Sequence, residues 1–238
     1  MVGLVVVSHS HALATAAVGL AGEMVSGESV PIAIAAGLDE HTFGTDAQRI
    51  QTAIEEVDGP DGVVVLMDLG SAILSAEMAL EFLDEGTRSR VVLSPAPLIE
   101  GLIAAAVTAS GGAGLGEVAR EAASGLRPKL EHLGQAKPAQ PDAGADGDLE
   151  AEFTIVNDDG LHARPAAVLV ATVRRYDAEV TLRCPPQDGP SVSAGSLTDL
   201  MTMTAAKGAR VQLRASGPQA QAALEAVLSL AERGFAPV

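Results

Sequence analysis

Polar residues follow three apolar segments in the first half of the chain, and two of these polar runs hold residues suited to group transfer. The first run, residues 8–11, reads Ser-His-Ser-His, and the third, residues 68–71, reads Asp-Leu-Gly-Ser. The second run covers residues 37–46. Parallel strands end at the same edge of a sheet, and such sheets bind ligands beyond that edge. We therefore expect the chemistry of this half of the chain to lie there.

His9 and Asp68 are the candidate nucleophile and its orienting acid. If the strands before them are neighbours, the two side chains meet at the edge of the sheet. A carboxylate bonded to one ring nitrogen fixes the tautomer of the imidazole and leaves the other nitrogen as a nucleophile. The backbone N–H groups of Gly70 and Ser71, at a predicted helix N-terminus, are suited to hold an anion. These residues together predict a site that accepts a phosphoryl group.

A second candidate histidine, His162, lies at a predicted junction between a strand and a helix in the second half of the chain. Pro165 is tolerated in a first helical turn, because its missing N–H has no intrahelical partner there. This spacing puts His162 at or near the helix N-cap, with the amide of Ala163 beside it and Arg164 close by. A helix N-terminus and a guanidinium both stabilise negative charge added to the imidazole.

Structural roles compete with these interpretations. A histidine just after a strand is often a turn residue, and His162 would then be an unusual N-cap. His9 and His11 form an H-x-H pair, but no third ligand at metal spacing is evident, so we expect no metal site. His41 and His132 are expected to lie on the surface.

Composition restricts the classes of partner. The chain has 238 residues and a formal net charge of −16, which disfavours nucleic acid and anionic membranes and favours a protein with a basic docking face. The single cysteine, Cys184, excludes an internal disulfide and is expected to be a small buried residue. The N-terminus lacks the basic region of a signal peptide, and its apolar run is far too short to span a membrane, so we expect a cytoplasmic location.

The elements that position these residues fall into two units. Residues 134–148 contain no large apolar side chain and predict a flexible linker between domains at 1–133 and 149–238. Fifteen flexible residues have a span of roughly 20 Å, which keeps two domains at an effective concentration on the order of millimolar.

The first unit is predicted to be a doubly wound parallel α/β sheet, because apolar strands alternate with helices. The expected strands are 4–7, 30–35, 63–67 and 91–93, and the expected helices are 11–25, 43–57, 72–83, 98–109 and 115–133. With aromatic residues at only 2%, its core must consist of Ala, Val, Leu and Ile.

The second unit is predicted to be an α+β open-faced sandwich with an antiparallel sheet. The expected strands are 150–156, 179–183, 191–193 and 210–214, and the expected helices are 163–176, 196–203 and 218–233, with Pro218 near the first turn of the last helix.

The run 160–166, Gly-Leu-His-Ala-Arg-Pro-Ala, resembles the active-site signature of HPr, the histidine phosphocarrier of the phosphoenolpyruvate-dependent phosphotransferase system. The resemblance covers about residues 150–235 and includes Ala-Lys-Gly-Ala at 206–209. It implies that His162 carries a phosphoryl group and that Arg164 assists. Ser196 matches a position that some HPr proteins use for regulatory phosphorylation, but its flanking residues differ and favour a helix N-cap.

The first unit resembles the mannose-type EIIA fold over about residues 1–133, and within that group it is most similar to the DhaM family. DhaM proteins are the phosphotransferase subunits of phosphoenolpyruvate-dependent dihydroxyacetone kinases. The matching stretches are 7–10, 44–46, 67–72 and 96–101. Mannose-type EIIA domains carry a Gly-Gly-Ser-Pro run after the aspartate, and this run is missing here.

These resemblances imply that the chain is the phosphotransferase subunit of an enzyme, a phosphoenolpyruvate–glycerone phosphotransferase. They also imply that it relays phosphoryl groups. Enzyme I would phosphorylate His162, His162 would phosphorylate His9, and His9 would rephosphorylate ADP held by the DhaL subunit, which works with DhaK. They also imply a homodimer formed through the first unit. No cofactor is expected, because the chain has no G-x-x-x-x-G-K-[ST] motif and its glycine-rich run 111–116 follows a helix instead of a strand.

Two other functions fit the same residues. The chain could serve a sugar transporter as an EIIA and HPr component, although the missing Gly-Gly-Ser-Pro run argues against that function. A regulatory module, whose phosphorylation state is read by a transcription factor, would send no phosphoryl groups to a small molecule.

Overall fold

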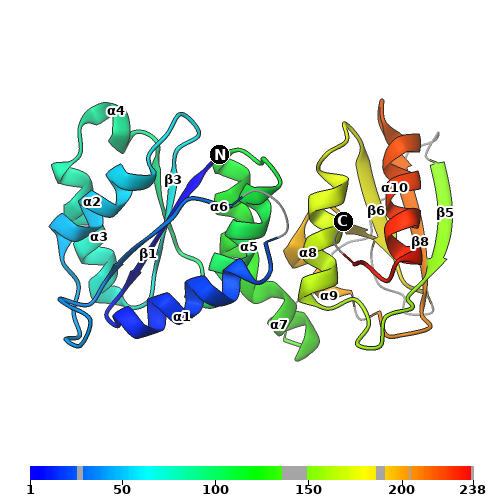
Figure 1. The fold of residues 1–238 in the computed structure, drawn as a ribbon, viewed down its shortest axis with the longest axis horizontal. Helices are drawn as coiled ribbons and strands as arrows, with labels where there is room; N and C mark the ends of the chain where they lie inside the picture. The colour runs from blue at the N-terminus through cyan, green and yellow to red at the C-terminus, as the bar shows by residue number, and fades with distance from the viewer. Residues whose placement is uncertain (26–28, 136–148, 186–190, 204, 237–238) are drawn as a thin grey trace. The chain divides into compact units, whose positions relative to one another are not determined.

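The computed structural model describes residues 1–25, 29–135, 149–185, 191–203 and 205–236. These residues form two compact units, Met1–Leu126 and Arg127–Val238 (Figure 1). The predicted linker at 134–148 lies almost wholly outside the described residues, so that prediction and the domain boundaries drawn from it stay predictions.

The first unit contains a four-stranded parallel sheet, as its alternating pattern predicts. The strands are β1 (Gly3–Ser8), β2 (Ile32–Ala36), β3 (Val63–Met67) and β4 (Val91–Ser94), in the order β2-β1-β3-β4. β1 pairs with β2 on one side and β3 on the other, with Val7 opposite Met67. The order of the strands therefore reverses between β1 and β3, and this reversal is the usual ligand position in open α/β sheets.

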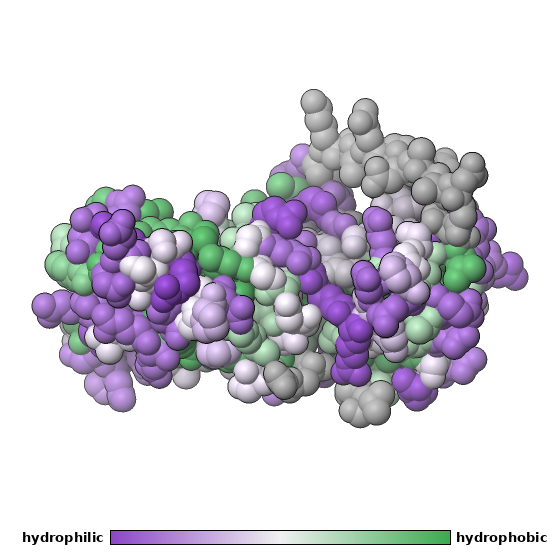
Figure 2. Space-filling model, turned by 90° about the horizontal axis from the view of Figure 1, so that it is seen from above, coloured by the Kyte–Doolittle hydropathy of each residue, from purple (hydrophilic) through white to green (hydrophobic). Residues whose placement is uncertain are grey.

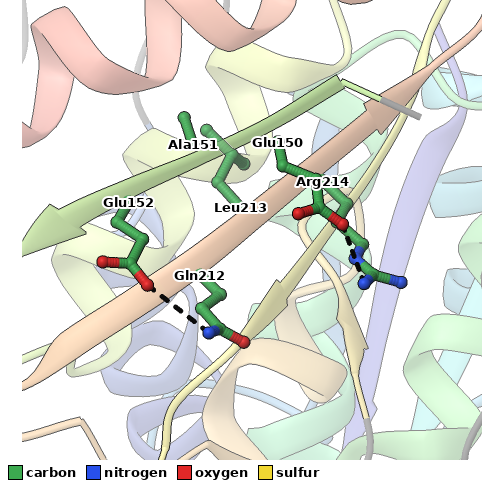
Figure 3. Close-up of a pocket in the computed structure, with 6 residues that line it drawn as sticks. All are labelled: Glu150, Ala151, Glu152, Gln212, Leu213 and Arg214. Atoms are coloured by element: carbon green, nitrogen blue, oxygen red, sulfur yellow. Dashed lines mark hydrogen bonds and ion pairs between the residues drawn. The ribbon is translucent and has the colours of Figure 1, made fainter.

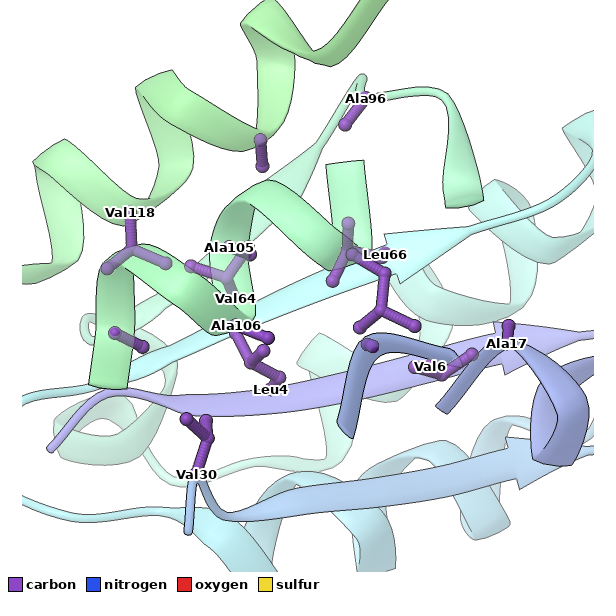
Figure 4. Close-up of a cluster of buried hydrophobic side chains, with 14 of the residues drawn as sticks. Leu4, Val6, Ala17, Val30, Val64, Leu66, Ala96, Ala105, Ala106 and Val118 are labelled. Atoms are coloured by element: carbon purple, nitrogen blue, oxygen red, sulfur yellow. The ribbon is translucent and has the colours of Figure 1, made fainter. Parts of the chain in front are cut away.

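Helices cover both faces of this sheet. One face packs against α1 (His11–Gly22), α5 (Leu98–Ser110) and α6 (Leu115–Ala123), and the other packs against α2 (Ala47–Val57) and α3 (Gly70–Phe82). Because strand side chains alternate, Leu4 and Val6 enter the first core whereas Val5 and Val7 enter the second. Figure 4 shows the first core, where Leu66 of β3 and Ala105 of α5 lie in the same layer. Many helix residues in these two cores are alanines, whose small side chains let the helix backbones lie close to the sheet.

Three elements of the first unit differ from the prediction. The second helix begins at Ala47 instead of residue 43, because the Asp46 side chain caps it by accepting from the N–H groups of Gln48 and Arg49. A short helix, α4 (Glu85–Arg88), was not predicted. The predicted helix 115–133 is divided into α6, a 3-10 turn (Ser124–Leu126) and α7 (Arg127–His132).

Close packing at Gly125 explains the division of that last helix. A Cβ atom on Gly125 would lie 2.9 Å from the backbone of Glu100 and Gly101 in α5, so only glycine fits here. The small residue that permits this approach also weakens the helix, since glycine is a poor helix former.

The second unit has the predicted antiparallel sheet. Its strands are β5 (Leu149–Thr154), β6 (Glu179–Arg183), β7 (Val192–Ser193) and β8 (Arg210–Ser216), in the order β5-β8-β6-β7. Its helices are α8 (Ala163–Val173), α9 (Leu197–Thr202) and α10 (Ala220–Glu232). The last helix begins at Ala220, two residues later than predicted, and Pro218 lies near its first turn, as expected.

The outer face of this second sheet is polar. A shallow depression there is lined by residues of β5 and β8, and Figure 3 shows its paired side chains. Arg214 donates to Glu150 at 2.8 Å, and Gln212 lies 3.4 Å from Glu152. The depression contains none of the residues that the sequence singled out for chemistry.

Figure 2 shows hydrophilic side chains over much of the visible surface of the first unit, interrupted by apolar patches. Within the described part of the chain, no helix has the length and apolar character needed to cross a lipid bilayer.

Candidate functional site

His9 and Asp68 meet at the carboxyl edge of the first sheet, as predicted. His9 follows β1 and Asp68 follows β3, and the pairing of these strands brings the side chains together. The ring Nδ1 of His9 lies 2.9 Å from Oδ1 of Asp68, and the backbone N–H of His9 donates to Oδ2 at 2.8 Å. The carboxylate therefore holds both the ring and the backbone of the histidine.

Asp68 accepts two further hydrogen bonds. The hydroxyl of Ser8 donates to Oδ2 at 2.9 Å, and the N–H of Leu69 donates to Oδ1 at 2.7 Å. Burial acts to raise the pKa of Asp68, whose side chain is only 12% exposed, but these donors and His9 outweigh it and hold the pKa below its usual value of 3.8. An ionised carboxylate only accepts hydrogen bonds, so Nδ1 of His9 must carry the proton and Nε2 the lone pair.

The other ring nitrogen, Nε2, lies 2.6 Å from the hydroxyl oxygen of Ser71. Ser71 is the second residue of α3, whose N-cap residue, Leu69, makes no side-chain capping bond. The first N–H groups of a helix have no partner within it and favour anions. The nucleophilic nitrogen thus faces a hydroxyl group and a helix N-terminus. Sequence reasoning chose the amide of Ser71 and missed its hydroxyl, which no pattern in the sequence indicates.

The segment after β2 also contacts the His9 turn. The N–H of Gly44 donates to the carbonyl oxygen of His9 at 3.0 Å, and the N–H of Gly37 donates to that of Ser8 at 3.1 Å. The predicted meeting of three polar runs at one edge is confirmed.

His162 occupies the N-cap of α8, as predicted, and Ala163 is the first residue of that helix. The His162 carbonyl accepts from the N–H of Ala166 at 3.0 Å, while its exposed imidazole makes no capping bond. Arg164, in the first helical turn, is also exposed, and Pro165 lies buried beside it. The ring is thus presented at the surface beside a helix N-terminus, with Arg164 two residues later in the first turn.

Contacts with the segment before β8 fix the His162 turn. Gly160 adopts a φ of +71°, and a Cβ atom there would lie 2.4 Å from the carbonyl oxygen of Ala205. The N–H of Leu161 donates to that same oxygen at 2.8 Å. Lys207 pairs with Asp158 and, by hydrogen bond and charge, lowers the pKa of that carboxyl. The Ala-Lys-Gly-Ala stretch therefore supports the turn that carries His162.

The remaining candidates have structural positions. Ser196 is 7% exposed and caps α9 by accepting from the N–H of Asp199 at 3.1 Å, which confirms the N-cap interpretation. Cys184 is buried after β6, and burial raises the pKa of its thiol. The run 111–116 connects α5 to α6, as expected.

The other histidines do not join either site. His41 and His132 are exposed, as predicted, and His11 is the first residue of α1. Among the described residues, no three His, Cys, Asp or Glu side chains gather closely enough to hold a metal ion.

Comparisons with known proteins agree with the two-unit organisation. The family described as "PTS system fructose IIA component" matches residues 3–119, and the family described as "PTS HPr component phosphorylation site" matches residues 149–233. One relative, the "PEP-dependent dihydroxyacetone kinase 2, phosphoryl donor subunit DhaM" of Listeria innocua, is 37% identical over 107 residues, which cover 45% of this chain and 85% of that protein. The chain belongs to the DhaM family.

Longer DhaM proteins match nearly the whole chain. The "PEP-dependent dihydroxyacetone kinase, phosphoryl donor subunit DhaM" of Pantoea ananatis is 41% identical over 242 residues, covering 99% of this chain and 50% of that protein. The DhaM of Escherichia coli is 40% identical over 242 residues, covering 99% of this chain and 51% of that protein. The chain therefore spans about half the length of these two DhaM proteins.

Proposed function

We propose that this chain is a phosphotransferase subunit that relays phosphoryl groups to a dihydroxyacetone kinase. His162 receives the group from Enzyme I and passes it to His9, and His9 passes it to ADP held by DhaL for use with DhaK. The names of the DhaM relatives, phosphoryl donor subunits of a PEP-dependent dihydroxyacetone kinase, support a role as phosphoryl donor to such a kinase. The two family matches support one phosphoryl-carrying histidine in each unit.

The hydrogen bonds of His9 support the proposal most directly. With the Nδ1 proton donated to Asp68, the lone pair of Nε2 attacks phosphorus as the bond from phosphorus to the donor imidazole breaks. The donor imidazole leaves with the electron pair of that bond, and the Nδ1 proton stays on His9. Positive charge that builds up on the His9 ring is stabilised by the Asp68 carboxylate, so no proton needs to move during transfer.

The incoming phosphoryl oxygens meet groups suited to an anion. The Ser71 hydroxyl, now 2.6 Å from Nε2, would release the nitrogen and donate to a phosphoryl oxygen. The N-terminus of α3 adds backbone N–H groups, with Gly70 as its first residue. Phosphoryl transfer depends mainly on such positioning and charge stabilisation.

His162 is suited to the role of mobile donor. Its ring is exposed and makes no capping bond, so it can approach another protein. The N-terminus of α8 and the guanidinium of Arg164 would stabilise the phosphorylated form without burying it.

The decisive experiment follows labelled phosphate from phosphoenolpyruvate, with Enzyme I, into the wild-type chain, His9→Ala and His162→Ala. DhaL carrying ADP, DhaK and dihydroxyacetone are then added. We expect label on both histidines of the wild type, none on His9 in His162→Ala, and dihydroxyacetone phosphate only when His9 is intact.

Label that loads onto the histidines but never leaves them would overturn the kinase relay and indicate a transporter component or a regulatory module. The homodimer implied by the resemblance stays a prediction, which sedimentation of the full chain would test.

A further inference from the structure

Exposed apolar side chains gather around the His9 turn. Five of them, which we call the His9 collar, come from α1, the β2–α2 loop and the start of α3, and they are Leu13, Leu38, Phe43, Leu69 and Ile73. Phe43 is 75% exposed and Leu69 is 63% exposed. Large apolar side chains that are exposed in one region mark an interaction site, whereas singly scattered ones need no explanation.

Backbone hydrogen bonds fix the collar next to the nucleophile. Phe43 directly precedes Gly44, whose N–H donates to the carbonyl of His9. Leu69 directly follows Asp68 and donates its N–H to that carboxylate. The collar therefore belongs to the same rigid edge of the sheet as the histidine.

The loop that carries Phe43 is ordered by its own bonds. The Asp39 carboxylate accepts from the N–H groups of His41 and Thr42 at 2.8 and 2.7 Å and from the Thr42 hydroxyl at 2.8 Å. Arg49 donates to the carbonyl of Gly37 at 2.7 Å, which ties the loop to α2. These bonds hold a large aromatic side chain in water. Rigid, exposed aromatic residues are typical anchors of protein interfaces.

We propose that the His9 collar is the docking surface for the separate, ADP-bearing acceptor subunit, with Phe43 as its anchor. This inference rests on the proposed function. An acceptor with a basic docking face complements the acidic surroundings of His9. Asp39 and Glu40 lie in the same loop as Phe43, and residues 1–133 contain 18 acidic against six basic residues.

Charge and connectivity argue against the other occupants. A second copy docked on the collar itself would bring Asp39 and Glu40 of one copy against the same residues of the other, which is unfavourable at this surface. The His162 unit is joined to this one in the same chain, so the predicted linker supplies an effective concentration on the order of millimolar without an anchor. A separate acceptor has no such tether and must be captured by its contacts.

The test compares Phe43→Ala with Phe82→Ala, a matched control. Phe82 is also an exposed phenylalanine, but it is the last residue of α3, at the end of the helix away from His9. Loss of label from phosphorylated His9 is measured against the concentration of ADP-loaded DhaL. For Phe43→Ala we expect a KM raised about tenfold or more, a maximal rate within about twofold of wild type and unchanged loading from Enzyme I.

Phe43→Leu keeps an apolar side chain and should show a smaller rise in KM, while Phe82→Ala should match wild type. Thermal unfolding of all three variants checks that the fold is intact. An unchanged KM in Phe43→Ala, an equal loss in Phe82→Ala, or an equal slowing of loading by Enzyme I would each overturn the docking proposal. Failure of the proposed function is a different result, since wild type would then lose no label to ADP-loaded DhaL at any concentration.

Discussion

The two candidate histidines differ in how their rings are held. His9 has a partner at each ring nitrogen, Asp68 at Nδ1 and Ser71 at Nε2. His162 is placed by its backbone alone, as the N-cap of α8, and its exposed ring makes no capping bond. The first ring is therefore pre-oriented for attack through one nitrogen, whereas the second can adjust to a partner.

Substituting Asp68 tests the orienting role of its carboxylate. Asp68→Asn keeps the shape of the side chain but can donate a hydrogen bond to Nδ1, which would favour the wrong tautomer of His9. We expect transfer from His162 to His9 to slow by roughly 10²-fold or more, measured by rapid quenching of labelled chain.

Asp46→Asn is the matched control for that substitution, because asparagine still caps α2 and transfer should stay at the wild-type rate. Equal rates in Asp68→Asn and wild type would contradict the orienting role.

Acid should weaken the first unit through the same carboxylate. Because hydrogen bonds hold the pKa of Asp68 below 3.8, its contribution to stability is fully present above that pH and is lost as the pH falls through the lower folded-state pKa. The difference in Tm between wild type and Asp68→Asn should therefore shrink as the pH falls below about 4. A difference that grows as the pH falls below about 4 would show that Asp68 is not stabilised as an anion.

The pairing of His9 with Asp68 was predictable from the sequence, because two buried parallel strands deliver their next residues to one edge. The role of the Ser71 hydroxyl was not, since its position depends on a side-chain rotamer and on the exact start of α3. The same limit applies to the collar: exposed apolar residues cannot be told from buried ones until the loop around Phe43 is seen.

At the scale of elements, the turns around His162 contain glycines whose backbone adopts the left-handed conformation. Gly160 has φ +71° and packs against Ala205, whereas Gly208 has φ +84° but faces open space. Gly208→Ala should cost about 1–2 kcal/mol from its backbone conformation alone. Gly160→Ala should cost more, because the carbonyl of Ala205 must also move, and it should slow loading of His162.

Chemical denaturation measures the loss of stability in each variant, and labelling by Enzyme I measures the rate at which His162 is loaded. Equal destabilisation by the two alanines would show that the contact with Ala205 is unimportant.

Element boundaries were predictable where turn residues bound an apolar run and less so elsewhere. The strands at 63–67 and 179–183 have the predicted limits, because turn residues bound their apolar runs. The helix predicted at 115–133 is interrupted, because Gly125 must approach α5 closely. That requirement comes from a neighbour distant in sequence, so no local pattern reveals it.

At the scale of the whole molecule, the proposed relay places its donor and acceptor histidines in one chain. If the predicted linker confines the two units, transfer from His162 to His9 should be faster within one chain than between chains. A mixture of His9→Ala and His162→Ala chains permits only transfer between chains. At micromolar protein we expect the mixture to transfer more slowly than wild type and to slow further on dilution, while wild type does not. Equal rates in both samples would exclude a tethered relay.

The division into two fold types was readable from the whole sequence, because continuous apolar strands give way to alternating ones after residue 148. The boundary predicted at residues 134–148 stays a prediction, because those residues lie almost wholly outside the described part of the chain.

The sheet order also has a consequence for synthesis on the ribosome. β1, at the N-terminus, is an inner strand, and its partner β3 emerges only after β2 and α2. A nascent chain that ends before Val63 already contains His9 but lacks Asp68 and Ser71. The two side chains that hold the ring of His9 therefore reach it only when pairing between distant segments is complete. If His9 carries the phosphoryl group as proposed, a nascent chain that ends before Val63 lacks the groups that orient its acceptor nitrogen.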